Sequence, residues 1–305
     1  MLAEQKAADS NSAGGTHIIG AEITPAPEFF INRNNMDTSV KQILLSNDDG
    51  IDSPGLWAAA EALSELGYVT VAAPRDHMSA TGRGFLKNAD GMITKKQLTV
   101  HGQEWDVYAV GGSPSQSVAH GVLEIVPQKP DLVVTGINFG ENLGTDVTWS
   151  GTVGAAIEAA SLGIPGLAMS QQIFFDAWDR DPMSIDFTTS AYFTKFFAKL
   201  MLEKQFPEDV HVLNVVVPEN ATPETGWKVT PLSNFRYSRP YVEREGKLEE
   251  KGRIRSRMLE TDKIIPGNDI HTVRVEKLVS VTPLSINLTS RIDLSDFEKL
   301  LRSDK

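Results

Sequence analysis

The chain has 305 residues and a formal net charge of -11 at pH 7. This length can bury the core of one large domain, alone or with an appendage. The negative charge argues against binding to nucleic-acid polymers and against docking on an anionic membrane, although a bound cation can reverse the field around a nucleotide. The sequence has no cysteine, which excludes disulfides, thiolate zinc sites and cysteine nucleophiles. The absence of cysteine is compatible with the cytoplasmic location that we expect.

Residues 1–38 differ from the rest of the sequence. They are polar and small over 3–15 and carry two prolines within 24–27, with no periodicity of a helix or strand. They lack the basic start and apolar core of a secretory signal, and no apolar run in the chain is long enough to span a bilayer. We therefore expect a poorly ordered extension. The alternative is a short arm docked through 18–19 or 29–31.

Strands and helices are predicted in alternation from residue 42 onwards. The branched apolar run 43–45 predicts a buried strand, and 56–63 predicts a helix. Further strands are predicted at 68–73, 131–135, 165–170 and 210–217, further helices at 115–125, 153–160 and 186–202, and a β hairpin at 92–100 with 104–110. This pattern predicts an α/β fold with a doubly wound, mostly parallel, Rossmann-like sheet over residues 39–226.

Residues 227–305 have a different character. The stretch 227–262 is charged and irregular and contains six arginines, at 236, 239, 244, 253, 255 and 257. A solvated hairpin is the favoured interpretation, over contact with nucleic acid. A final core strand is predicted at 278–282 and a short terminal helix at 295–301. Because this part has too few apolar residues for a core of its own, we expect an arm that packs on the main domain or on a neighbouring subunit of a homo-oligomer.

Two adjacent carboxylates, Asp48 and Asp49, directly follow the first predicted strand. Open parallel sheets bind their ligands outside the carboxyl ends of their strands. Neighbouring anions repel each other, and a bound cation relieves this repulsion. The alternative is an Asx turn that caps the next helix.

Two further polar loops follow other predicted strands, one around Ser79 and one around Asn138. With the two aspartates, they would converge on one edge of the sheet and offer only oxygen ligands, which suit Mg²⁺, Mn²⁺ or Ca²⁺ better than zinc. Ser150, Gly151 and Thr152 stand at a predicted helix start, where backbone N–H groups and a hydroxyl can bind an anion. A hard cation beside a helix N-terminus predicts a site for a phosphate ester.

Several motifs in this order resemble the SurE survival-protein family of metal-dependent 5'/3'-nucleotidases. They are residues 43–50 with 54–55, 73–74 with 79–82, 112–114, 131–144, 150–153, 213–218 and 279–284. The similarity extends over roughly residues 41–290. Because ordered motifs agree, the match is far more specific than one glycine loop.

The resemblance implies one divalent ion per subunit, Mg²⁺ or Mn²⁺, held by Asp48, Asp49, Ser79 and Asn138. It also implies hydrolysis of nucleoside 5'- and/or 3'-monophosphates to nucleoside and phosphate, and dimers or tetramers built through the C-terminal arm. Some relatives also cleave short polyphosphate, which remains an alternative substrate.

In this interpretation, the catalytic residues are Asp48 and Asp49, and Asp48 acts as the base or orients the attacking water. Direct attack by an aspartate is the alternative. Asn47 and the stretch 150–152 would position the phosphoryl oxygens, although Asn47 could instead brace its turn. Trp149 either stacks on a base or packs its loop, and we expect His77 to be a solvated loop residue.

Three rival functions fit the sequence less well. A phosphate-accepting receiver domain would need a further aspartate at the end of a later strand, whereas Asp131 precedes its strand. A haloacid-dehalogenase-like phosphatase would need its second aspartate where Gly50 stands. A non-catalytic nucleotide-binding module of Rossmann type would need a glycine fingerprint after the first strand.

Overall fold

The computed structural model describes residues 40–100, 102–173, 182–260 and 264–303, and the extension expected at 1–38 lies outside this part of the chain. The strands are β1 (Gln42–Ser46), β2 (Tyr68–Pro74), β3 (Ile93–Val100), β4 (Gln103–Val110), β5 (Leu132–Phe139), β6 (Gly166–Gln171), β7 (Val212–Val217), β8 (Trp227–Val229), β9 (Ser238–Arg244), β10 (Gly252–Met258) and β11 (Val279–Leu284). The helices are α1 (Pro54–Leu63), α2 (Pro114–His120), α3 (Gly151–Ser161), α4 (Thr188–Glu203), α5 (Asp269–His271) and α6 (Leu294–Arg302). Shorter or irregular turns cover Gly121–Ile125, Gly144–Thr148, Pro182–Ser184 and Thr272–Glu276.

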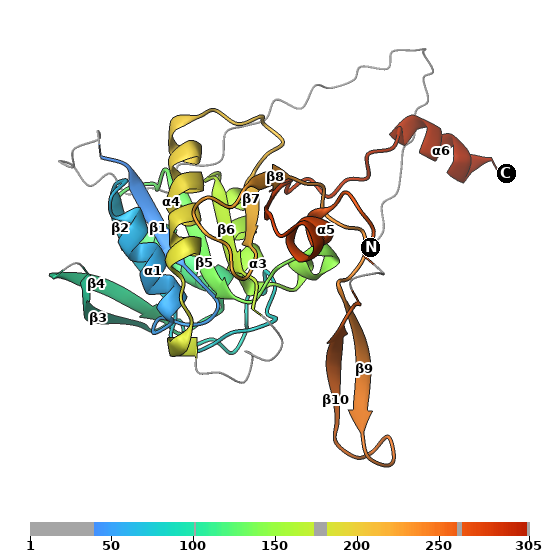
Figure 1. Cartoon of the computed structure of the whole chain (residues 1–305), viewed down its shortest axis with the longest axis horizontal. Helices are drawn as coiled ribbons and strands as arrows, with labels where there is room; N and C mark the ends of the chain where they lie inside the picture. Colours follow the sequence, from blue (N-terminus) through green and yellow to red (C-terminus); the bar gives the residue numbers. More distant parts are fainter. Residues whose placement is uncertain (1–39, 101, 174–181, 261–263, 304–305) are drawn as a thin grey trace, which may run out of the picture.

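Within the described residues, nine strands form one sheet in the order β3-β4-β2-β1-β5-β6-β7-β11-β8 (Figure 1). The strands from β4 to β7 in this order run parallel to their neighbours, whereas β3 and β11 run antiparallel to β4 and β7. The expected doubly wound, mostly parallel α/β fold is therefore confirmed, together with the hairpin of β3 and β4.

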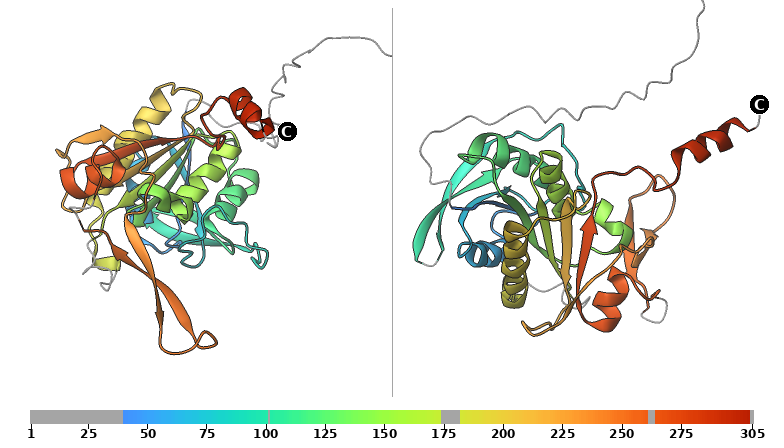
Figure 2. Two further views of the ribbon diagram at one scale, coloured as in Figure 1. Left: turned by 90° about the vertical axis from the view of Figure 1, so that its right-hand side faces the viewer. Right: turned by 90° about the horizontal axis from the view of Figure 1, so that it is seen from above.

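The two faces of β1 explain why its sequence is an unbroken apolar run. Ile43 and Leu45 pack in the cluster that contains α1 and α4, whereas Leu44 packs in the cluster that contains α2 and α3. Successive side chains of a strand point to opposite faces, so a strand covered on both sides needs apolar residues throughout. Figure 2 shows these two helical layers on either side of the sheet.

Strand β5 is longer than the sequence predicts, because it continues beyond residue 135 to Phe139. A bulge between Thr135 and Asn138 interrupts its pairing with β6. Gly136 lies in this bulge with a φ of 125°, and a Cβ there would overlap the carbonyl oxygen of Met169. Glycine therefore lets the strand resume after the irregularity, which brings Asn138 opposite Ser170 at the end of the sheet.

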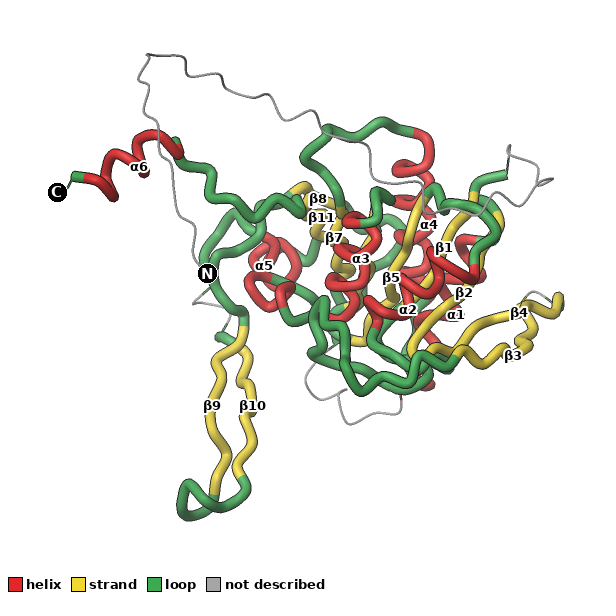
Figure 3. Tube along the Cα trace, turned by 180° about the vertical axis from the view of Figure 1, so that it is seen from behind, coloured by secondary structure: helices red, strands yellow, loops and turns green. Residues whose placement is uncertain are grey.

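The C-terminal part divides into two structural roles. Strands β8 and β11 join the main sheet, and α5, which the sequence does not predict, packs against β11. Strands β9 and β10 form a separate antiparallel hairpin that projects from the body, as Figure 3 shows from behind. We call β9–β10 the C-terminal hairpin and residues 233–238 the arm root. Among the described residues, none of the helices combines the length and apolar character that crossing a membrane requires.

The order of the strands defines where a ligand can bind. From β1 the chain moves to β2 on one side, whereas β5, β6 and β7 follow on the other side of β1. The gap between β1 and β5 is thus a topological switch point, and such sheets bind ligands outside the carboxyl ends of the strands there.

We expect Gly154→Ala to destabilise the fold next to the loop that carries Ser79. A Cβ at Gly154 in α3 would overlap the backbone of Gly82, so one of the two segments must move. The free energy of unfolding should fall by about 1–3 kcal/mol, measured by chemical denaturation. Gly226→Ala is a matched control because its new Cβ would meet only the Leu278 side chain at 3.4 Å. Equal effects of the two substitutions would contradict this account.

Candidate functional site

The turn after β1 is built around Asn47. This side chain is fully buried, its Nδ2 donates to the Gly50 carbonyl at 2.9 Å, and its Oδ1 accepts from the Gly50 N–H at 3.2 Å. Gly50 has a φ of 98°, which favours glycine and lets the turn close. Asn47 therefore braces its turn through both ends of the amide, and its contact with phosphate stays a prediction.

Asp48 is held at the first turn of α3. The Thr152 hydroxyl donates to Asp48 Oδ1 at 2.5 Å, and both side chains are buried. A Cβ at Gly151 would lie 2.8 Å from Asp48 Oδ2, so glycine permits the close approach. Burial raises the pKa of Asp48 and the hydrogen bonds from Thr152 lower it, with burial the larger effect. Thr152 thus orients Asp48, and its contact with phosphate stays a prediction.

Asp49 points from the same turn into the adjacent cavity. Its Oδ2 accepts from the Phe139 N–H at 3.0 Å, and His77 Nε2 lies 3.8 Å from its Oδ1. The side chain is only 14% exposed. Burial, together with the negative charge of Asp48, raises the pKa of Asp49 to about 7. Burial and mutual repulsion therefore disfavour the form in which both carboxylates are charged, and a bound cation would favour it.

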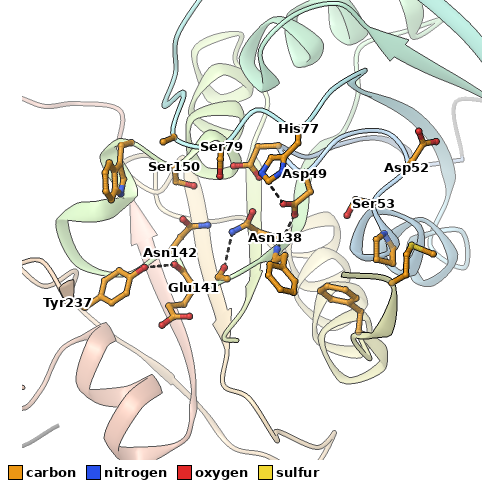
Figure 4. A pocket seen from close by; sticks show the side chains of 18 residues that line it. Asp49, Asp52, Ser53, His77, Ser79, Asn138, Glu141, Asn142, Ser150 and Tyr237 are labelled. Carbon is orange, nitrogen blue, oxygen red and sulfur yellow. Dashed lines mark hydrogen bonds and ion pairs between the residues drawn. The ribbon is translucent and has the colours of Figure 1, made fainter. Parts of the chain in front are cut away.

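Hydrogen bonds hold the Ser79 loop over this turn. The Met78 N–H donates to the Asp48 carbonyl at 2.8 Å, and the Gly82 N–H donates to the Trp149 carbonyl at 2.8 Å. Ser79 is exposed and lines the cavity. Figure 4 shows Ser79, Asp49 and His77 gathered in one part of the cavity, between Ser150 and Ser53.

Asn138 completes this group from the end of β5. Its Nδ2 donates to the Gly140 carbonyl at 2.8 Å, so the amide oxygen is the atom left for a ligand. Asp48, Asp49, Ser79 and Asn138 all line one cavity, and together they offer carboxylate, hydroxyl and amide oxygens. Such oxygens are the ligands of hard divalent cations, and the two adjacent carboxylates supply negative charge that balances the charge of the cation. These residues fit a divalent metal.

The cavity is much larger than the site of a single ion. It has a volume of about 650 Å³, within the range of small-molecule sites. Its lining comprises Asp48, Asp49, Asp52, Ser53, Pro54, His77, Ser79, Ala80, Asn138, Phe139, Gly140, Glu141, Asn142, Trp149, Ser150, Met183, Phe187 and Tyr237. Ser150 lies at the rim and caps α3, because its Oγ accepts from the Val153 N–H at 3.1 Å. The lining combines acidic and polar groups with aromatic side chains, which suits an anionic ligand with an apolar part.

The comparisons with known proteins agree with this geometry. The family model described as survival protein SurE matches residues 43–239. The chain is 41% identical to 5'-nucleotidase SurE from Thermococcus gammatolerans, over 85% of this chain and 94% of that protein. It is 38% identical to 5'-nucleotidase SurE from Thermococcus kodakarensis, over 85% and 98%. The crystal structure of the SurE protein from Aquifex aeolicus superposes with a TM-score of 0.68 at 34% identity, covering 86% of this chain and 99% of that one.

The chain belongs to the SurE family.

Three further residues line the cavity of this SurE-family chain, beyond those assigned to the site from the sequence. His77, which we expected to be solvated, lies beside Asp49 and lines the cavity, although its side chain is 61% exposed. Asn142 donates through Nδ2 to Ser170 Oγ at 2.8 Å and is buried in the cavity wall. Tyr237 comes from the arm root, and its hydroxyl donates to the Glu141 carbonyl at 3.1 Å. No local pattern connects Tyr237 to a cavity formed mainly by residues before 190, so the sequence offers no signal for it.

We expect Asp49→Asn to stabilise the metal-free protein, increasingly so as the pH rises. The raised pKa means that folded Asp49 keeps a proton between pH 3.8 and about 7, whereas the unfolded chain releases it. Wild-type stability therefore falls as the pH rises through this window and does not recover above it. The amide side chain of Asp49→Asn does not titrate, so the stability of this variant does not fall through this window. Thermal melts with EDTA at about pH 5 and about pH 8 measure the difference.

Asp52→Asn is the matched control, because the Asp52 carboxylate at the cavity rim is 74% exposed. Added Mg²⁺ should stabilise the wild type and leave Asp49→Asn nearly unchanged, since a ligand raises stability only where it binds. Identical melting of wild type and Asp49→Asn at the higher pH would contradict the buried, repelling pair.

Proposed function

We propose that this chain is a divalent-metal-dependent phosphomonoesterase that hydrolyses nucleoside 5'- and/or 3'-monophosphates to nucleoside and phosphate. The observation that carries the proposal is the adjacent pair of the buried Asp48 and the mostly buried Asp49, which follows β1, contacts the first turn of α3 and lines a large cavity. The similarity to proteins named 5'-nucleotidase SurE supports the same activity.

In this proposal Asp48, Asp49, Ser79 and Asn138 hold one Mg²⁺ or Mn²⁺ ion. When bound, the metal polarises the phosphoryl oxygens and lowers the pKa of a coordinated water. Thr152 occupies Oδ1 of Asp48, so Oδ2 is the oxygen of Asp48 that remains for a ligand.

The residues of the chain then divide the remaining work. Asp48 accepts the proton of the attacking water or orients that water towards phosphorus. The new bond joins the water oxygen to phosphorus, and the bond between phosphorus and the nucleoside oxygen breaks. That oxygen takes up a proton from solvent, so the nucleoside leaves as an alcohol, and Asp48 returns the proton that it accepted to solvent. The Ser150 hydroxyl and the Gly151 N–H, at the start of α3, would contact the phosphoryl oxygens. The positive end of the helix dipole lies at the same place and favours an anion there.

The alternatives are less well supported. A non-catalytic nucleotide-binding module would have no use for two repelling carboxylates at its phosphate end, because they disfavour an anion unless a cation is bound. Short polyphosphate would leave the apolar parts of the cavity, such as Phe187 and Tyr237, without contacts. Hydrolysis of a nucleoside monophosphate would use both the acidic and the aromatic side chains of the cavity.

Release of phosphate from a panel of nucleoside 5'- and 3'-monophosphates, with Mg²⁺, with Mn²⁺ and with EDTA, tests the proposal. We expect metal-dependent turnover that Asp49→Asn lowers by at least about 100-fold, since even outer partners of metal ligands contribute about 10–100-fold. Calorimetric titration should show much weaker Mn²⁺ binding by the folded variant. Phosphate release that is unaffected by EDTA, or wild-type metal affinity in the variant, would contradict the proposal.

We also propose that the C-terminal hairpin forms a subunit interface. Its strands expose Tyr241, Val242 and Ile254, and its tip exposes Leu248. An isolated two-stranded hairpin is at best marginally stable in water, and such apolar side chains gain stability when another surface covers them. The arrangement favours a homodimer or a larger homo-oligomer.

Replacing residues 240–256 with a short turn should convert the protein to smaller species while the arm root stays in place. Light scattering behind size exclusion gives the mass of both forms. Arg253→Glu is a useful companion, because it changes the charge of the hairpin and keeps its apolar residues. A wild-type monomer at micromolar concentration would overturn the proposal and leave the hairpin as an intramolecular element.

A further inference from the structure

Trp149 stands at the wall of the cavity, directly before the residue that caps α3. Its side chain is 42% exposed and lines the cavity. Its backbone is fixed on both sides, because its N–H donates to the Asp146 carbonyl at 3.2 Å and its carbonyl accepts from the Gly82 N–H at 2.8 Å. The half-exposed ring on this fixed backbone is available to a ligand in the cavity.

Arg236 from the arm root covers one face of this ring. The guanidinium carbon lies 5.1 Å from the centroid of the Trp149 ring, and Arg236 Nε lies 3.2 Å from Asp146 Oδ1. Asp146 is buried, and its other oxygen accepts from Ser238 Oγ at 3.3 Å. This network fixes the guanidinium, and the cation on the ring face in turn fixes the indole.

Arg236 lies outside the cavity that Trp149 lines. It borders instead a second hollow of about 330 Å³ at the arm root, together with Phe235 and Ile270. Arg236 therefore covers one face of the indole from outside the cavity, whereas the cavity itself is lined by Trp149. The face of the ring opposite the guanidinium is the one that a planar ligand in the cavity would use.

Tyr237 bounds the same cavity and is also fixed. Its hydroxyl donates to the Glu141 carbonyl, and burial strongly raises the pKa of this hydroxyl, which therefore stays neutral. Figure 4 shows the Tyr237 ring and Asp49 far apart along the cavity, with Asn142 between them. A ligand with its phosphate near Asp49 could extend its other end towards Trp149 and Tyr237.

We propose that Trp149, backed by Arg236, is the stacking surface for the nucleobase of the substrate and makes the enzyme prefer nucleotides to phosphate esters without an aromatic group. This inference rests on the proposed phosphomonoesterase function. Stacking of a base on an aromatic side chain is tolerant of base identity, because every base has a π face. The preference would therefore be for a leaving group that carries any nucleobase, and not for one particular base.

The matched pair of substrates is adenosine 5'-monophosphate and ribose 5-phosphate, which differ only in the base. The readout is the ratio of their kcat/KM values for wild type, Trp149→Ala and Trp149→Phe. We expect Trp149→Ala to lower this ratio about tenfold or more, mainly through KM for the nucleotide, as expected for the loss of one stacking contact. Trp149→Phe should keep most of the preference, because an aromatic face remains.

Trp227→Ala is the control, since Trp227 is similarly exposed, at 47%, but lies on β8 away from the cavity. It should leave the ratio unchanged. An unchanged ratio in Trp149→Ala, or an equal loss for both substrates, would overturn the inference while leaving the phosphatase function intact.

If the wild type hydrolyses neither substrate, the proposed function itself fails. Quenching of tryptophan fluorescence by adenosine then decides the base site. Quenching that disappears in Trp149→Phe would support it, and quenching that persists there, or is absent from the wild type, would overturn it.

Discussion

The contact between Asp48 and the first turn of α3 is the interaction on which the site depends. The Thr152 hydroxyl donates to Asp48, and Gly151 has no side chain to keep the helix away. This contact ties the end of β1 to the helix that follows β5, across the switch point of the sheet. Without it, Asp48 would be a buried carboxylate that lacks its strongest hydrogen bond, at a substantial cost in free energy.

The same burial that prepares the site opposes the stability of the fold. Asp49 keeps its proton to about pH 7 because burial and the charge of Asp48 both disfavour its ionised form. The core on both faces of the sheet, from Leu44 on one side to Leu45 on the other, offsets this cost. Stability and metal affinity are therefore linked through one proton, as is common where ligands must lose protons to bind.

The positions of the site residues follow from the sequence to the extent that they follow strands. Asp48, Ser79 and Asn138 each lie just beyond a predicted strand, and a parallel sheet brings such ends together. The hydrogen bond from the Thr152 hydroxyl to Asp48 could not be predicted, because the two residues lie 104 positions apart in the sequence. The length of β5 depends on the bulge at Gly136, which is set by its tertiary contact with β6 rather than by local propensity.

The arm root shows why the C-terminal segment cannot be separated from the site. Asp269 is a buried carboxylate that accepts from the Gly144 N–H at 2.7 Å and from the Ser233 N–H at 2.8 Å. Residues 236–238 each contact the loop that carries Trp149, through an ion pair or a hydrogen bond. The loop and the arm root are therefore held together, since a shift of either would leave buried polar groups without partners. Tyr237 in the wall of the cavity directly precedes Ser238, the first residue of β9, so the C-terminal hairpin starts at the cavity wall itself.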